Sequence, residues 1–305
     1  MSSNPKRSLR WYLYNHKDDL QPLQMGTYLF SGSYTPQALI AHINEWPIRS
    51  YDKVTILEWW SIYDIDTSLT KKWFIGAWEY IAYVSSAENI TSISNKYAFV
   101  KKFLDTKPQN APEKVSLEGL LYPDTYNINN NQPFLDQLVS LQLKAFQSKV
   151  YQPYLSQIDG FSSHLRSQWY NFDMGFYNIV TLASIVEKEE RSAKNKPTIA
   201  GIFLNRIQEW MRIDADITLC YGLHTWYESC TPSLIVKSIT DSNNLYNTRV
   251  HNGLTPTPIA NPSFVSFKSL LNFVKNNNYY YLHGSDGSIY YGKTIQEHTL
   301  NKQYL

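Results

Sequence analysis

The sequence predicts an α+β fold, and two observations carry this prediction. Apolar residues over 178–191 recur at the i, i+3, i+4, i+7 spacing of one helix face. Two tyrosine-rich runs, 279–283 and 289–291, flank a Gly-Ser-Asp-Gly turn and predict a β-hairpin. Long helices together with a local hairpin indicate the α+β class.

The first part of the chain is predicted to consist of short elements. In order, we expect a strand over 26–30, a helix over 36–44 capped by Thr35, a strand over 53–57, helices over 61–69, 77–84 and 99–104, and a turn-like polar segment over 89–95. A strand with two small helices is typical of a compact binding module. The segment 105–113, which contains Pro and Asn, then marks a domain boundary.

The second part of the chain is predicted to hold the longer helices. A strand and turn over 117–126 are followed by helical periodicity over 134–155, 178–191 and 197–208. Beyond residue 213 we expect loops and short strands rich in Asn, Thr and Pro, ending in the hairpin. The chain is therefore predicted to divide into residues 1–50, 51–112 and 113–305.

Composition excludes several classes of function. The 28 basic and 26 acidic residues leave a net charge of +2, which gives no electrostatic basis for a nucleic-acid partner. No apolar run approaches the roughly 20 residues that a membrane-spanning helix needs, and no hydrophobic segment follows the basic residues 1–10, so no signal peptide is predicted. The 24 Tyr, 13 Phe and 9 Trp favour core packing, with stacking on sugar rings as the second interpretation.

The two cysteines, Cys220 and Cys230, have no cluster of His or Cys around them, so they do not indicate a zinc site. One disulfide and two buried thiols are both open, and we favour the thiols.

The helix over 178–191 ends in three glutamates, Glu187, Glu189 and Glu190. Carboxylates at a helix C-terminus oppose the helix dipole. At about 100° per residue, Lys188 points away from the apolar face, Glu190 falls near its centre, and the other two glutamates flank it. A half-desolvated glutamate has the raised pKa that a general acid needs. A solvated helix end is the alternative, and the periodicity does not select one residue.

Other sites of chemistry are weaker or absent in the sequence. No Gly-rich phosphate loop, metal-spaced His pair or nucleophile elbow is present, so we expect neither a metal nor an organic cofactor. His251, His283 and His298 are isolated, as structural histidines usually are. Most glycosidases use two carboxylates, and Asp216 is the candidate for the second.

An ordered series of short motifs resembles the endolytic murein transglycosylase family. The matching pieces are Glu118–Tyr126, Ala183–Glu189, Ala200–Arg206, Met211–Thr218, Tyr221–Gly222, Tyr246–Thr248, Gly253–Leu254, Pro258–Pro262 and Glu297–His298. Singly each is weak, but their order over roughly residues 50 to 300 is specific. Val54–Glu58 and the helices after it resemble the family's small LysM-like module, which would precede a mixed α+β catalytic domain.

The resemblance implies a non-hydrolytic cut between MurNAc and GlcNAc that leaves a 1,6-anhydro-MurNAc end and terminates the elongation of nascent strands. The family position of the single acid/base corresponds to Glu189, with Glu187 as the runner-up. The residues that match recurrent motif positions, and that we expect at the glycan groove, are Glu118, Asn205, Asp216, Thr218, Tyr246, Asn247 and Thr248. Each of these also fits a purely structural role.

The chain departs from the family at two glycine positions, which are Trp59 and Trp210 here. Only glycine enters positive φ freely, so tryptophan at a turn is sterically severe. The chain has 12 Gly, below the usual ~7%. We therefore hypothesise that the gene reads UGA as glycine, whereas this sequence reads it as tryptophan.

The resemblance also implies a location and partners. Family members act at the extracytoplasmic face of the bacterial membrane on an N-terminal anchor, which this chain lacks, so we expect either a start assigned too late or a lost anchor. The implied partners are peptidoglycan strands and the peptidoglycan synthases of elongation or division. A hydrolytic muramidase using Asp216 or Asp214, and an inactive wall-binding protein, remain the alternatives.

Overall fold

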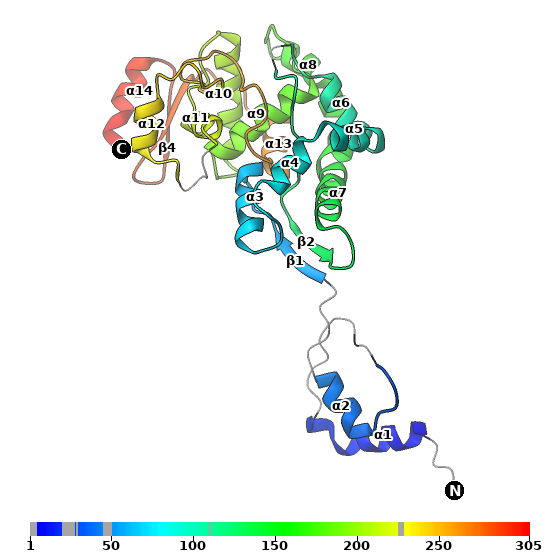
Figure 1. Cartoon of the computed structure of the whole chain (residues 1–305). Coiled ribbons are helices and arrows are strands. Elements are labelled where there is room, and N and C mark those ends of the chain that lie inside the picture. Colours follow the sequence, from blue (N-terminus) through cyan, green and yellow to red (C-terminus); the bar gives the residue numbers. More distant parts are fainter. Residues whose placement is uncertain (1–4, 20–27, 29, 45–50, 110, 225–228) are drawn as a thin grey trace. The chain divides into compact units, whose positions relative to one another are not determined.

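The computed structural model describes residues 5–19, 28, 30–44, 51–109, 111–224 and 229–305 (Figure 1). The chain forms two compact units. One comprises residues 1–54 and 126–137, and the other comprises 55–125 and 138–305. The predicted division at residues 50 and 112 remains a prediction.

The first unit contains helices α1 (Pro5–Asn15) and α2 (Pro36–Asn44) and strand pairing between β1 (Tyr51–Thr55) and β2 (Thr125–Asn129). The Thr35 hydroxyl accepts a hydrogen bond from the Ala38 N–H (3.2 Å), which confirms the predicted cap of α2. Helix α1 was not expected from the sequence. The strand predicted over 26–30 falls largely outside the described residues.

The second unit begins with four short helices: α3 (Ile62–Lys71), α4 (Glu79–Ser85), α5 (Ala87–Lys96) and α6 (Ala98–Asp105). The turn predicted over 89–95 is wrong, because this segment is α5. Ser86 caps α5 at the Asn89 N–H (3.4 Å), and Ile90 is its buried contact while most of its polar side chains are exposed. β1 pairs with a strand some 70 residues later, so a LysM-like module is not confirmed.

Helix α9 (Phe176–Glu189) is the centre of the second unit. It packs against α6, α8 (Gln152–Ser167), α10 (Lys196–Gln208), α11 (Asp216–Gly222) and α13 (Phe264–Leu271) (Figure 1). Every residue from Phe176 to Glu187 except Asn178 is buried. A helix buried on all sides is a core element, and the burial extends to the acidic end, where Glu187 and Glu190 are each 4% exposed. The helical periodicity over 134–155 is confirmed as α7 (Phe134–Phe146), a π-helical turn at Gln147–Tyr151 and the start of α8.

The C-terminal part contains the predicted hairpin. Strands β3 (Tyr280–His283) and β4 (Ile289–Gly292) pair antiparallel with Tyr281 opposite Tyr291. The loops otherwise predicted beyond residue 213 are wrong, since α11, α12 (Pro232–Ser238), α13 and α14 (Ile295–Asn301) lie there. Helices of seven or eight residues give little periodic signal and depend on tertiary packing.

Two further findings concern the cysteines and the membrane. Cys220 and Cys230 form a disulfide, with their Cα atoms 5.7 Å apart, so the expectation of free thiols is corrected. Within the described ranges, no helix combines the length and the apolar character needed to cross a bilayer.

Candidate active site

The charged residues at the end of α9 contact different partners. Lys188 forms an ion pair with Asp64 (3.5 Å) and its side chain is nearly buried, so the expectation that it faces away from the packed side is wrong. This follows from the burial of α9 on all sides, which leaves the helix no solvent face. The three glutamates lie in distinct environments. Glu190, the residue after α9, accepts a hydrogen bond from the Ser192 N–H (2.6 Å) and lies 3.2 Å from the His283 Nε2, so His283 is not isolated.

Glu187 is held inside the protein. Its carboxylate lies 3.3 Å from the Lys196 ammonium and accepts hydrogen bonds from the Ser263 N–H (2.9 Å) and hydroxyl (2.8 Å). Glu187 is 4% exposed. Through these buried contacts, the Glu187 carboxylate holds the end of α9 to the start of α10 and to the start of α13.

Glu189 lines a cavity of about 460 Å³, which we call the Glu189 cavity. The Tyr281 hydroxyl donates to its carboxylate (2.7 Å). Burial raises the pKa of Glu189 above its ordinary value, and the charge of Asp216 adds to the rise, whereas the Tyr281 hydrogen bond opposes it. The C-terminal end of the α9 dipole also disfavours a negative charge here. A carboxyl with a raised pKa on a cavity wall can hold a proton and deliver it.

Charged groups of both signs share this cavity with Glu189. Arg249 pairs with Asp214 (3.0 Å) and with Asp216, so both aspartates are engaged by one guanidinium. The other residues that line the cavity are Arg206, Tyr280, Tyr281, Ile295, His298 and Lys302. A cavity with several cations and tyrosines suits a polar, hydroxyl-rich ligand, and no cluster suited to a metal ion is found among the described residues.

Asp216 owes its position to a buried pair of threonines. The Thr218 and Thr248 hydroxyls lie 2.8 Å apart, and the Thr248 hydroxyl also accepts from the Ala215 N–H (3.1 Å). Both threonines are essentially unexposed. They therefore fix the start of α11 against the loop that carries Arg249. Of these three predicted site residues, Asp216 lines the cavity and the two threonines do not.

Three further predicted site residues hold loops in place. Asn205 accepts from the Tyr170 hydroxyl (2.6 Å) and donates to the backbone before β3. Asn247 is unexposed and donates to three backbone carbonyls over residues 238–241. The Tyr246 hydroxyl lies 2.8 Å from that of Thr257. None of the three lines the Glu189 cavity.

Glu118 lies in the interior. It is unexposed and accepts hydrogen bonds from the Ile62 N–H (2.9 Å), the Asn261 amide (2.9 Å) and the Tyr221 hydroxyl (3.3 Å). Burial raises the pKa of Glu118 to about 8, although the Ile62 hydrogen bond opposes the rise. The structure thus separates Glu118 from the cavity residues.

Sequence reasoning missed most of the cavity's cations and tyrosines. Arg206 lies in one of the matching motifs, and Tyr281 lies in the predicted hairpin. Neither pattern predicted that these residues lie near the end of α9. Arg249 follows the Tyr246–Thr248 motif directly, which was the available signal. His298, treated as isolated, lines the cavity with its Nδ1 buried and without a hydrogen-bond partner in the described structure.

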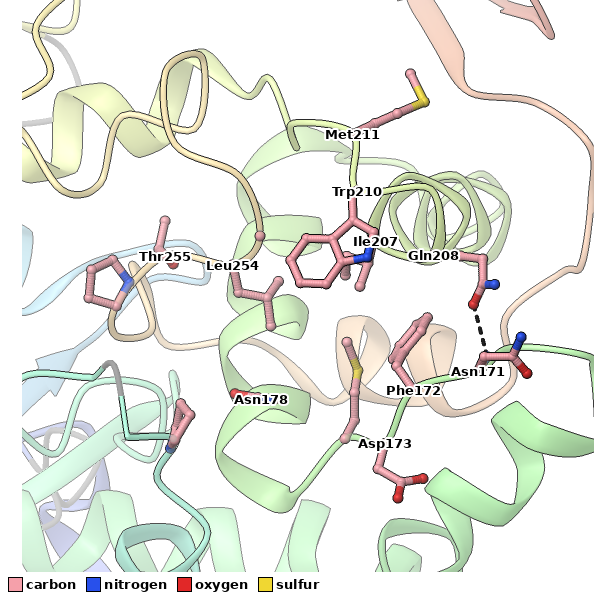
Figure 2. Close-up of a pocket in the computed structure, with 14 residues that line it drawn as sticks. Asn171, Phe172, Asp173, Asn178, Ile207, Gln208, Trp210, Met211, Leu254 and Thr255 are labelled. Atoms are coloured by element: carbon pink, nitrogen blue, oxygen red, sulfur yellow. Dashed lines mark hydrogen bonds between the residues drawn. The ribbon is translucent and has the colours of Figure 1, made fainter.

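A second cavity of about 450 Å³, the Phe172 cavity, is more apolar (Figure 2). Figure 2 shows Ile207, Trp210 and Leu254 on one side of it and Phe172 below, with Gln208 accepting from the Asn171 N–H (2.8 Å). A third, connecting cavity of about 360 Å³ shares Trp210 and Met211 with the Phe172 cavity. The residues that it shares with the Glu189 cavity are Arg206, Asp214 and Tyr280. The connecting cavity therefore adjoins both of the others.

Known proteins resemble this chain in sequence and in fold. It is 28% identical over 208 residues to the endolytic murein transglycosylase of Bacillus subtilis, covering 67% of this chain and 52% of that protein. It is 26% identical over 222 residues to the endolytic murein transglycosylase of Streptococcus pneumoniae strain D39, covering 72% of this chain and 38% of that protein. The chain thus spans about half or less of these relatives' length.

The fold matches a crystal structure of a putative yceG-like protein from Listeria monocytogenes, with a TM-score of 0.66 at 23% identity. This similarity covers 98% of the present chain and 91% of the other. The sequence pattern of the YceG-like family matches residues 2–304. The chain therefore belongs to the YceG-like family.

Proposed function

We propose that this chain is an endolytic lytic transglycosylase of peptidoglycan with Glu189 as its acid/base. The observation that carries the proposal is the Glu189 carboxyl on a cavity wall, with its pKa raised by burial and a hydrogen bond from Tyr281. Relatives that share the family are named endolytic murein transglycosylases. The remaining predicted residues act mainly by holding the walls, and Asp216 is the one that we place in contact with the glycan.

The proposed reaction needs one carboxyl group. Protonated Glu189 gives its proton to the oxygen that links C1 of MurNAc to C4 of GlcNAc, and the C1–oxygen bond breaks. The 6-hydroxyl oxygen of the same MurNAc then bonds to C1, and its proton passes to the Glu189 carboxylate. The products are a 1,6-anhydro-MurNAc end and a free GlcNAc 4-hydroxyl, and Glu189 is protonated again. No metal or organic cofactor takes part.

Runner-up Glu187 fits this role less well. An acid/base must reach the substrate, and the Glu187 carboxylate is enclosed by Lys196 and Ser263.

The adjoining cavities support a polymeric substrate. A glycan strand has repeated sugar units on either side of each bond, so an endolytic enzyme needs a groove longer than one sugar. The Glu189 cavity continues into the connecting cavity, with which it shares Arg206 and Tyr280. The connecting cavity continues into the Phe172 cavity, with which it shares Trp210. Aromatic rings and guanidinium groups in these walls suit sugar faces and hydroxyls.

A hydrolytic muramidase is the second candidate, because Asp216 lines the same cavity as Glu189. Asp216 would have to activate water, yet one of its carboxylate oxygens is already engaged by the Arg249 guanidinium. We favour the transglycosylase for this reason. An inactive wall-binding protein is the third outcome.

We further propose that the enzyme works on the extracytoplasmic side of the membrane, where nascent glycan strands are made. Peptidoglycan synthases of elongation or division are the proposed partners, since a cut in a nascent strand would end its elongation.

Product analysis distinguishes these functions. Purified sacculi are digested with the full chain in heavy-oxygen water, and soluble muropeptides are examined by mass spectrometry. We expect 1,6-anhydro-MurNAc ends without heavy oxygen. Reducing MurNAc ends that carry heavy oxygen would replace the proposal by the muramidase, and binding to sacculi without release of any muropeptide would make the chain a wall-binding protein.

A further inference from the structure

Tryptophan occupies most of the strained backbone positions in this protein. Within the described residues, seven non-glycine residues have φ between 52° and 71°, and five of them are Trp59, Trp73, Trp78, Trp169 and Trp210. The other two are Asp214 and His224, which belong to the residue types that tolerate this region best. For a bulky side chain such a φ is an outlier, so its recurrence in one residue type needs a cause.

Three of these tryptophans end helices where glycine normally stands. Trp73, Trp169 and Trp210 are each the second residue after α3, α8 and α10, respectively. In each case two backbone N–H groups close the helix end in the Schellman pattern, which requires a left-handed residue at this position and usually has glycine there. The bonds run from Trp73 to Thr70 and Phe74 to Leu69, from Trp169 to Arg166 and Tyr170 to Leu165, and from Trp210 to Ile207 and Met211 to Arg206, at 2.8–3.2 Å.

The other two tryptophans sit at the glycine position of tight turns. Trp78 has φ 70° and ψ −1° and is the third residue of a turn closed from the Glu79 N–H to the Gly76 carbonyl (3.4 Å). Trp59 has φ 61° and is the third residue of a turn closed from the Trp60 N–H to the Leu57 carbonyl (3.4 Å). A positive φ at the third residue defines the type II turn, which selects glycine.

Three of the five side chains gain little that could offset this strain. Trp73 is 92% exposed, Trp169 83% and Trp210 80%, so their indoles bury almost no apolar surface. Trp60 is the contrast to Trp59: both are half-buried, but Trp60 has no positive φ, and its carbonyl accepts hydrogen bonds from the Asn261 N–H and amide. The backbone therefore distinguishes these neighbouring tryptophans, because Trp59 has a left-handed conformation that favours glycine and Trp60 does not.

We propose that the native protein has glycine at all five positions, 59, 73, 78, 169 and 210, because its gene encodes glycine there by UGA. The total of 12 glycines, low for 305 residues, fits the same cause. The resemblance to the family indicates glycine at positions 59 and 210. The backbone conformation indicates it at three more positions, 73, 78 and 169.

Glycine at position 210 also changes the proposed groove. Trp210 lines both the Phe172 cavity and the connecting cavity, and its indole lies between Leu254 and Phe172 in Figure 2. Glycine would remove the indole from the wall that the two cavities share and leave Met211 as the shared residue.

Two measurements on the gene and its product test the proposal without reference to activity. We expect UGA codons at the five positions and UGG at Trp60, and we expect peptides of the protein isolated from its own organism to contain glycine at the five sites. UGG codons or tryptophan-containing peptides at these sites would overturn the proposal.

Synthetic genes give an independent physical test. Replacing the five tryptophans by glycine should raise the Tm by about 2 °C or more per position, whereas replacing them by alanine, which shares the left-handed strain, should raise it less. The matched control Trp11→Gly, at an exposed position inside α1, should not raise the Tm. Equal Tm values for the tryptophan and glycine forms would contradict the proposal.

Discussion

Two glutamates of this protein, Glu118 and Glu189, respond to burial in the same direction but differ in access. Burial raises the pKa of both. Glu118 is enclosed by donors from Ile62, Asn261 and Tyr221, whereas Glu189 faces a cavity of about 460 Å³. A raised pKa therefore does not identify a catalytic acid by itself. The carboxyl must also be able to meet a substrate.

The largest expected effect concerns Glu118, and it is a dependence of the free energy of unfolding on pH. The pKa of Glu118 is about 8 in the folded protein and near 4.5 when unfolded, so the folded state binds the proton more tightly. Its contribution to the free energy of unfolding is complete below about pH 4.5 and is lost as the pH rises to about 8, by up to about 5 kcal/mol. Glu118→Gln mimics the protonated form and should keep this stability.

Urea unfolding of both proteins at a series of pH values between about 4.5 and 9 checks this prediction. The variant should become more stable than the wild type toward the alkaline end. A constant difference across the whole range would show that Glu118 titrates normally.

Truncation to alanine should sharpen the comparison. Glu118→Ala leaves the Ile62 N–H, the Asn261 amide and the Tyr221 hydroxyl without a buried acceptor, and should cost about 3 kcal/mol or more of unfolding free energy. Glu189→Ala removes one hydrogen bond, from the Tyr281 hydroxyl at the cavity wall, and should cost about 1 kcal/mol or less. Denaturant midpoints measure both, and equal losses would remove the distinction between a sealed and an accessible carboxyl.

The smallest effect concerns the tyrosine beside Glu189. Tyr281→Phe removes a hydrogen bond that lowers the pKa of Glu189, so the alkaline limb of the pH–rate profile should move to higher pH. Tyr290→Phe, on the other strand of the hairpin and bonded to Asp286, is the control and should leave the profile in place. A shift to lower pH in Tyr281→Phe would show that the hydroxyl favours the protonated form.

The sequence predicted the elements with a strong local signal. The periodicity over 178–191 and the turn at 284–287 identified α9 and the hairpin, and Thr35 identified the start of α2. It failed for α5 and for α11 to α14, because short helices draw their stability from packing that a local pattern does not contain. The disulfide between Cys220 and Cys230 was missed for a related reason, since only the fold brings the two residues together.

The candidate site was predictable in part. Periodicity placed Glu187, Glu189 and Glu190 around one helix end but did not rank them, and the ordered motifs selected Glu189. The approach of Tyr281 and Arg249 to that helix end arises from contacts across more than 50 residues of sequence, which no local pattern reveals. The burial of Lys188 against Asp64 was likewise hidden, because a helix wheel assumes a solvent face that α9 lacks.

The most direct test of the account is digestion of sacculi by the wild type, Glu189→Gln and Glu88→Gln, with 1,6-anhydro-MurNAc ends counted by mass spectrometry. Glu88 is an exposed glutamate at the start of α5, outside the cavity. We predict that Glu189→Gln loses about 10²- to 10⁴-fold in rate at an unchanged Tm, while Glu88→Gln cuts like the wild type. Release of anhydro ends by Glu189→Gln at the wild-type rate would contradict the assignment of Glu189 as the acid/base.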